Sequence, residues 1–292
     1  MIDQAEGNGP AIKVEDLSYA YGDLLAVNHI DFEVARGEVL GFLGPNGAGK
    51  STTIKMLTGQ LRPKTGRALI MGRDIRKDDV EVQARIGVCF EEKNLYLNMS
   101  ARENLLFFSR LFGIKGFDPD ALLGRVGLAD RAADRVKNLS KGMKQRLMVA
   151  RSLVNDPEVL FLDEPTDGLD PVSSSSIRSI IKEEAARGAA VLLTTHDMME
   201  ADALSDRVAF INDGEIVALD TPENLKLQYG MRAVKVRSRV DGGVREDVVP
   251  LDGPDVGDRL KEAVAAAGIM TIHTEEATLE SIFIRLTGRG LE

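Results

Sequence analysis

The sequence has few of the residues that mark several classes of protein. Its 292 residues include one cysteine, Cys89, and no tryptophan, and aromatic residues make up only 5% of the chain. A single cysteine excludes an internal disulfide and any zinc site built on several thiolates. The longest apolar runs, such as residues 189–193, are only long enough for a strand, so we expect no segment that spans a bilayer.

The N-terminal segment lacks a secretory signal, and the chain lacks an excess of positive charge. Residues 1–10 have neither the apolar core nor the cleavage site of a secretory signal, so we expect a flexible tail there and a cytoplasmic protein. Positive charge is in deficit, because 37 Lys and Arg face 46 Asp and Glu and give a formal net charge of −9. A negative surface is repelled by nucleic acid, so we expect no nucleic-acid partner.

What is present is an ordinary globular composition, with 43% hydrophobic and 28% charged residues. Short apolar runs alternate with helical stretches, which is typical of an α/β protein with a parallel sheet. The runs predict strands at 12–17, 30–34, 39–43, 159–162, 189–193, 208–211 and 216–219. The last two flank Asn212-Asp213-Gly214, a turn that predicts a hairpin.

Two further regions have a different pattern. From about residue 84 to 155 the apolar spacing is helical, so we predict a mostly helical insert in a main domain over 11–230. Beyond it the strand pattern returns at 234–240 and 244–249, with helices predicted at 256–267 and 279–286. We interpret 231–292 as a small α+β C-terminal domain.

The nine residues 44–52, which directly follow the strand predicted at 39–43, fit a phosphate-binding loop. The last three of them begin a helix predicted at 50–60. Lys50 is expected to reach the β- and γ-phosphates, and Ser51 to ligate Mg²⁺, while glycines let backbone N–H groups face the phosphates. A plain glycine turn is the alternative, which the strand-loop-helix context disfavours. The loop consists of Gly44, Pro45, Asn46, Gly47, Ala48, Gly49, Lys50, Ser51 and Thr52.

Two adjacent carboxylates, Asp163 and Glu164, follow the strand predicted at 159–162. Open α/β sheets bind ligands at the carboxyl ends of their strands. Asp163 would hold Mg²⁺ directly or through water, and Glu164 would be the base that polarises the attacking water. A solvated acidic loop is the alternative. Together with the phosphate-binding loop, the pair predicts hydrolysis of a nucleoside triphosphate.

The segment Leu139-Ser140-Lys141-Gly142-Met143 resembles the signature loop of ABC-type ATPases, which usually reads Leu-Ser-Gly-Gly-Gln. Ser140 and Gly142, which approach the γ-phosphate in that family, are kept. Lys141 and Met143 depart from the pattern, and Lys141 is either an added phosphate contact or a solvated lysine.

Other residues follow in the family order. Tyr21 matches the aromatic residue that stacks on adenine, Asp170 lies in the loop after the catalytic glutamate and would link the two sites of a dimer, and His196 matches the switch histidine. The resemblance implies a P-loop ATPase with a mixed central sheet, an antiparallel β subdomain and a helical insert. It also implies a homodimer, or pairing with a similar chain, that closes on two ATP molecules.

Glu91 aligns with a position where the family usually has a glutamine that contacts Mg²⁺. A carboxylate also ligates Mg²⁺, but it repels the γ-phosphate when the metal is absent. We therefore expect Glu91 to be a metal ligand and the metal dependence to be steeper than with glutamine.

The end of the signature segment, Gly142-Met143-Lys144-Gln145-Arg146, and the segment 278–283 resemble ATP-binding subunits that export drugs and antibiotics through a separate permease. This resemblance implies a protein at the cytoplasmic face of the membrane. The permease would contact residues 91–99, where Leu95, Tyr96 and Leu97 are apolar, unless these pack inside the insert. The alternatives are a soluble ABC-type ATPase that acts on nucleic acid or the ribosome, and a switch with little hydrolysis. The C-terminal domain would serve regulation, dimer contacts or stability.

Overall fold

The protein, seen in a computed structural model, divides into two compact units, the first ending at Leu219 and the second spanning Asp220–Gly290. Residues 1–8 of the predicted tail lie outside the described residues. The structure describes residues 9–92, 94–230, 233–240, 243–251, 255–265, 268–275, 277–288 and 290.

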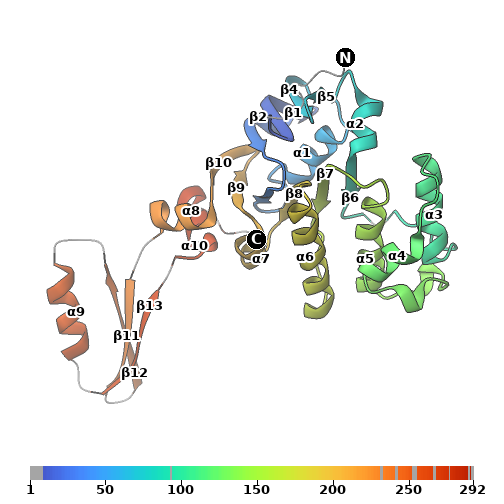
Figure 1. The fold of residues 1–292 in the computed structure, drawn as a ribbon. Helices are drawn as coiled ribbons and strands as arrows, with labels where there is room; N and C mark the ends of the chain where they lie inside the picture. Colours follow the sequence, from blue (N-terminus) through green and yellow to red (C-terminus); the bar gives the residue numbers. More distant parts are fainter. Residues whose placement is uncertain are drawn as a thin grey trace. The chain divides into compact units, whose positions relative to one another are not determined.

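A six-stranded sheet forms the centre of the first unit, with the order β10-β9-β3-β8-β7-β6 (Figure 1). Its inner strands are parallel. They are almost wholly apolar because both faces are covered, one by α1 (Lys50–Leu57) and a second sheet and the other by helices such as α5 (Lys141–Ser152) and α6 (Pro171–Ala186). The hairpin between β9 and β10 turns at Asp213 and Gly214, which both have positive φ. The strands are β3 (Val39–Leu43), β6 (Ile86–Cys89), β7 (Val159–Asp163), β8 (Ala190–Thr195), β9 (Arg207–Asn212) and β10 (Glu215–Asp220).

A second, antiparallel sheet has the order β2-β1-β4-β5. One core cluster joins it to the central sheet through helix α1 (Lys50–Leu57), whose Ile54 side chain is fully buried. The helix predicted at 50–60 ends at Leu57, because the chain turns at Gly59 with a φ of 76°. The strands are β1 (Ile12–Tyr21), β2 (Leu24–Val34), β4 (Thr65–Ile70) and β5 (Arg73–Asp74).

The region predicted as a helical insert contains α3, α4 and α5, whose buried residues share one core cluster with α6 and a face of the central sheet. Helices α2, α6 and α7 also belong to this unit. The start of the insert differs from the prediction, because β6 lies inside the range 84–155 and pairs with β7. A Cβ at Gly87 would lie 2.0 Å from the Ser152 carbonyl oxygen, so the strand fits only with glycine there. The helices are α2 (Asp79–Arg85), α3 (Ala101–Leu111), α4 (Pro119–Arg125), α5 (Lys141–Ser152), α6 (Pro171–Ala186) and α7 (Met198–Leu204).

The second unit is a three-stranded antiparallel sheet, order β12-β11-β13, with three helices. Helix α8 belongs to this unit although the sequence places the boundary at residue 230, because α8 packs on α10. Strand β13 was not predicted, and the last two residues of the helix predicted at 256–267 lie outside the described residues. The elements are α8 (Pro222–Tyr229), β11 (Ala233–Val240), β12 (Gly243–Pro250), α9 (Val256–Ala265), β13 (Ile269–Glu275) and α10 (Leu279–Thr287).

The predicted α/β class with a mixed central sheet, an antiparallel sheet and a helical region is confirmed. Within the described ranges, no helix combines the length and the apolarity that crossing a bilayer requires.

Cys89 is fully buried at the end of β6, and the Nε2 atom of Gln145 lies 3.8 Å from its Sγ. Burial raises the pKa of the thiol to about 12. Because the thiolate is the reactive form, we expect a thiol reagent to modify the native protein at least ~1,000-fold more slowly than the protein in guanidinium chloride. Rates measured with an aromatic disulfide reagent test this, and equal rates in the two conditions would contradict it.

Candidate active site

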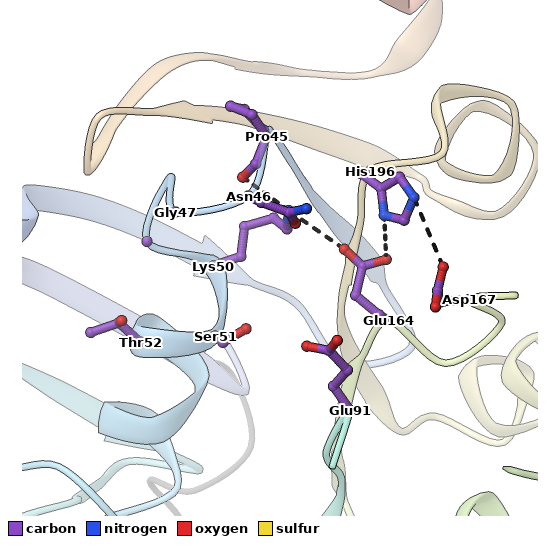
Figure 2. Close-up of a pocket in the computed structure, with 11 residues that line it drawn as sticks. Pro45, Asn46, Gly47, Lys50, Ser51, Thr52, Glu91, Glu164, Asp167 and His196 are labelled. Carbon is purple, nitrogen blue, oxygen red and sulfur yellow. Dashed lines mark hydrogen bonds and ion pairs between the residues drawn. The ribbon is translucent and has the colours of Figure 1, made fainter. Parts of the chain in front are cut away.

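A cavity of about 330 Å³ lies where β3 ends and α1 begins (Figure 2). All but one of its lining residues were predicted from the sequence, the exception being Asp167. The lining residues are Pro45, Asn46, Gly47, Gly49, Lys50, Ser51, Thr52, Glu91, Glu164, Asp167 and His196. The structure therefore brings together the phosphate-binding loop, a carboxylate after β7 and the histidine after β8.

The loop between β3 and α1 needs glycine at several positions. Gly47 and Gly49 have φ values of 82° and 108°, which side chains rarely adopt. A Cβ at Gly49 would lie 2.5 Å from the Ala26 carbonyl oxygen. No side chain of the described residues caps the helix that begins at Lys50. Its first N–H groups and its partial positive charge are therefore available to an anion.

Lys50 is buried, and its ammonium group faces the cavity. Its Nζ donates to the carbonyl oxygens of Gly44, at 2.5 Å, and Pro45, at 3.2 Å. The Oε1 atom of Glu164 lies 3.5 Å from the same Nζ. Because both side chains are almost wholly buried, this cation attracts negative groups more strongly than an exposed lysine would. A phosphate entering the loop would compete with Glu164 for it.

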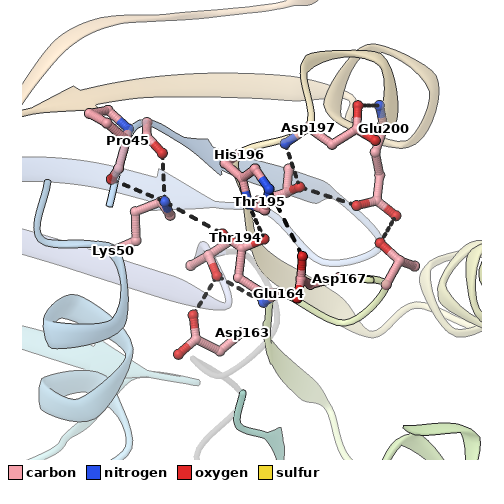
Figure 3. A network of polar contacts seen from close by, with 12 residues as sticks. Pro45, Lys50, Asp163, Glu164, Asp167, Thr194, Thr195, His196, Asp197 and Glu200 are labelled. Atoms are coloured by element: carbon pink, nitrogen blue, oxygen red, sulfur yellow. Dashed lines mark hydrogen bonds and ion pairs between the residues drawn. The ribbon is translucent and has the colours of Figure 1, made fainter. Parts of the chain in front are cut away.

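The three predicted metal ligands, Ser51, Glu91 and Asp163, line a second hollow of about 240 Å³. Ser51 Oγ donates to Asp163 Oδ1 at 3.1 Å. Thr194 Oγ1 donates to the same oxygen at 2.5 Å, as Figure 3 shows. Hydroxyl and carboxylate oxygens are the ligands that Mg²⁺ prefers. Thr194 was not predicted, since a threonine at the end of an apolar strand is typical of any strand.

Glu164 has a strained backbone, with a φ of 49°. The left-handed region costs a non-glycine residue about 1–2 kcal/mol. It is held there by its N–H group, which lies 3.1 Å from both the carbonyl oxygen and the Oγ1 of Thr194. Within the described residues its Oε1 accepts no hydrogen bond, although it is buried. Such strain concentrates at functional sites, and here it aims a carboxylate at the cavity.

His196 lies beside this carboxylate. Its Nδ1 is 3.0 Å from Glu164 Oε2, and its Nε2 is 4.0 Å from Asp167 Oδ1. The side chain is 47% exposed, so the imidazole reaches both the buried glutamate and the solvent. Asp167 lies in the segment 166–171 that matches the family loop, but nothing in the sequence distinguishes it from its neighbours.

Three predicted site residues lie outside the cavity, in the contact between α5 and α6. Ser140 Oγ accepts from Met143 N–H and caps α5. Asp170 Oδ1 accepts from the N–H groups that begin α6, and the Ser173 N–H bond holds the pKa of this carboxyl below its usual range. A Cβ at Gly142 would lie 2.6 Å from Ser173 Oγ, so the two helix ends touch.

Two other residues of the family pattern also lie outside the cavity. Tyr21 is 46% exposed at the end of β1, and its ring packs edge-on against that of Tyr19. Lys141 lies 3.9 Å from Asp167 Oδ2. This exposed ion pair joins the signature loop to the loop that follows Glu164 in the same chain.

Known proteins are similar to this chain over most of its length. The family described as ABC transporter matches residues 27–167. A fluoroquinolones export ATP-binding protein of Mycobacterium tuberculosis is 46% identical, covering 96% of this chain and 94% of its own length. A Nod factor export ATP-binding protein I of Paraburkholderia xenovorans is 37% identical, covering 97% and 98%.

A solved structure extends the similarity to the fold. It is the dimeric, post-hydrolysis state of an ATP-binding cassette with ADP and Pi, and it is 26% identical with a TM-score of 0.65. The match covers 72% of this chain and 98% of that one. With the sequence identities above and a loop, carboxylate and histidine that meet in one cavity, the chain belongs to the ABC transporter family, as an ATP-binding subunit whose ATP hydrolysis is coupled to transport.

Proposed function

We propose that this chain powers a separate membrane permease that exports a drug, an antibiotic or another small amphiphilic compound. The relatives named above are export proteins, and they match over nearly their whole length. The observation that carries the hydrolysis that drives export is that Lys50 and Glu164 meet in one cavity. A net charge of −9 disfavours the alternative, an ATPase that acts on nucleic acid.

In this proposal Lys50 and the N-terminal N–H groups of α1 hold the phosphates of ATP. When a γ-phosphate takes the Lys50 ammonium, Glu164 Oε1 loses its cation and accepts a hydrogen bond from the attacking water. His196, 3.0 Å from the other oxygen, orients the carboxylate. Ser51 and Asp163, with Glu91 beside them, would hold Mg²⁺, which neutralises charge on the phosphates.

A homodimer would explain why some family residues lie outside the cavity. Ser140 Oγ uses a lone pair to cap α5, so its O–H remains able to donate to a phosphate held by a second copy. Gly142 lets the start of α5 lie close to the start of α6, because a Cβ there would lie 2.6 Å from Ser173 Oγ. Asp170, which begins α6, would link the two sites. The dimeric structure with ADP and Pi supports this arrangement.

A groove of about 410 Å³ between the sheet and the insert offers a place for the permease. Phe90, Phe108 and Phe112 line it, and Arg151 stacks over the Phe108 ring at 4.9 Å. Of the three apolar residues predicted to face a permease, Leu95 is buried in the insert, whereas Tyr96 and Leu97 are about half exposed. A permease bound at this groove would hold the chain at the cytoplasmic face of the membrane.

Co-purification tests the proposal. The chain carries a tag and is co-expressed with the permease encoded beside it, and Mg-ATP hydrolysis is measured on the purified material. We expect a membrane subunit to co-purify and to raise turnover. Leu97→Asp should reduce co-purification, whereas Leu227→Asp, at a leucine on α8 that is more exposed than Leu97, should not. Isolation of the chain with ribosomes or nucleic acid and no permease would contradict export.

Glu91→Gln tests the metal dependence. The carboxylate repels a metal-free triphosphate by about 1 kcal/mol, so the variant should bind ATP in EDTA about 5-fold more tightly than the original chain. In Mg²⁺ the two should differ less. Calorimetric ATP binding in both buffers measures this, with Glu81→Gln as a control because Glu81 is exposed on α2 and lines neither the nucleotide cavity nor the second hollow. An unchanged ratio between the two buffers would show that Glu91 does not face the phosphates.

A further inference from the structure

Glu200, in α7, is a buried carboxylate next to the active site. It is 3% exposed, and burial raises the pKa of its carboxyl. A buried acid is costly unless its oxygens are hydrogen-bonded. Here both are, because Oε1 accepts from Thr166 Oγ1 at 2.5 Å and Oε2 accepts from Thr195 Oγ1 at 3.2 Å (Figure 3).

The two threonines belong to different loops. Thr166 follows Glu164 by two residues, and Thr195 directly precedes His196. The ladder between β7 and β8 ends at the pair Asp163 and Thr194. Beyond this pair the two segments of the chain are no longer paired as strands. Beyond the ladder Glu200 joins the two segments through both of its carboxylate oxygens, in addition to the contact between His196 and Glu164.

The turn that carries the histidine is tied to the same carboxylate. Asp197 N–H donates to Thr195 Oγ1 at 3.0 Å, and Glu200 N–H donates to Asp197 Oδ1 at 3.1 Å. His196 thus lies in a short segment braced at both ends. Its side chain is half exposed, so the backbone on either side must fix its position relative to Glu164.

We propose that Glu200 is a positioning residue that keeps Glu164 and His196 within hydrogen-bond distance by tying Thr166 and Thr195 to one buried carboxylate. Its consequence is that the two loops move as one body when the nucleotide changes. The inference rests on the proposed roles of Glu164 and His196 in hydrolysis. Catalytic groups must be held to within about 0.5 Å of their working positions, and a loop that is fixed at only one end does not hold them so closely.

Steady-state ATP hydrolysis by the full chain tests the inference. Glu200→Ala should lower kcat about 30- to 100-fold with the KM for ATP changed less than about 3-fold, because a displacement of about 1 Å costs that much in rate. Glu200→Gln should restore most of the activity, since its carbonyl oxygen accepts from one hydroxyl and its amide donates to the other. This variant keeps the volume, so it also addresses folding.

Glu184 supplies a matched control. It is 1% exposed on α6 and pairs with Arg125 and Arg187 rather than with the catalytic loops. Glu184→Gln should lower the melting temperature but leave kcat per folded molecule within about 2-fold, because it touches no catalytic loop.

A double-mutant cycle separates a brace from a local packing effect. Thr166→Val should lower kcat in the original chain but add little in the Glu200→Ala background, because coupled sites are not additive. Wild-type kcat in folded Glu200→Ala, or full additivity, would overturn the inference. Wild-type turnover of Glu164→Gln and His196→Ala would instead overturn the proposed catalytic roles, whatever Glu200 does.

Discussion

Glu164→Gln is expected to lower kcat for ATP hydrolysis by a factor of about 10²–10⁴ while ATP still binds. The amide has the same size and keeps a hydrogen-bonding contact with His196, but it cannot accept a proton from water. The left-handed backbone at this position is also unchanged, since glutamine meets the same steric limits as glutamate. Turnover and retention of radiolabelled ATP on the purified protein measure both parts.

Glu158 provides the control for this experiment. It precedes β7, at the other end from Glu164, and it pairs with Arg36 and Arg85 on the surface. Glu158→Gln should leave kcat within about 2-fold, because exposed ion pairs contribute little. If the two variants hydrolysed ATP equally well, Glu164 would not be the base.

Lys50→Met should weaken ATP binding about 30- to 100-fold, because a hydrogen bond to a charged group contributes about 2–3 kcal/mol. Methionine fills a similar volume in this buried position but donates nothing to a phosphate, to Gly44 or to Pro45. Calorimetric titration with ATP measures the change. Lys64→Met, at an exposed site after α1, should bind normally. An unchanged Kd for Lys50→Met would show that the phosphates lie elsewhere.

The phosphate-binding loop could be predicted because its chemistry is local. A buried strand, a run with glycine at fixed spacing and a helix start are all contained in residues 39–57, and glycine positions such as Gly49 follow from backbone sterics alone. The carboxylates after β7 were predictable for the same reason. The fold class followed from the alternation of strands and helices.

Contacts between distant segments could not be predicted. Strand β6 is only four residues long, so its structure depends on pairing with β7, some seventy positions along the chain. Asp167, Thr194 and Glu200 have ordinary sequence surroundings, and their roles depend on which loops the sheet brings together. The limits of the C-terminal domain stay a prediction, although α8 packs within the second unit.

The buried thiol of Cys89 can also report on local opening of the structure around it. Cys89 is the last residue of β6, two positions before Glu91, and Gln145 of α5 lies against its Sγ. Arg151 of the same helix donates from Nη1 to the backbone oxygen of Asn94 at 2.9 Å. Reagent reaches the sulfur when the junction between β6 and α5 opens. The only cysteine in the chain is therefore a built-in reporter, whose modification rate gives the opening frequency of that junction with no engineered label.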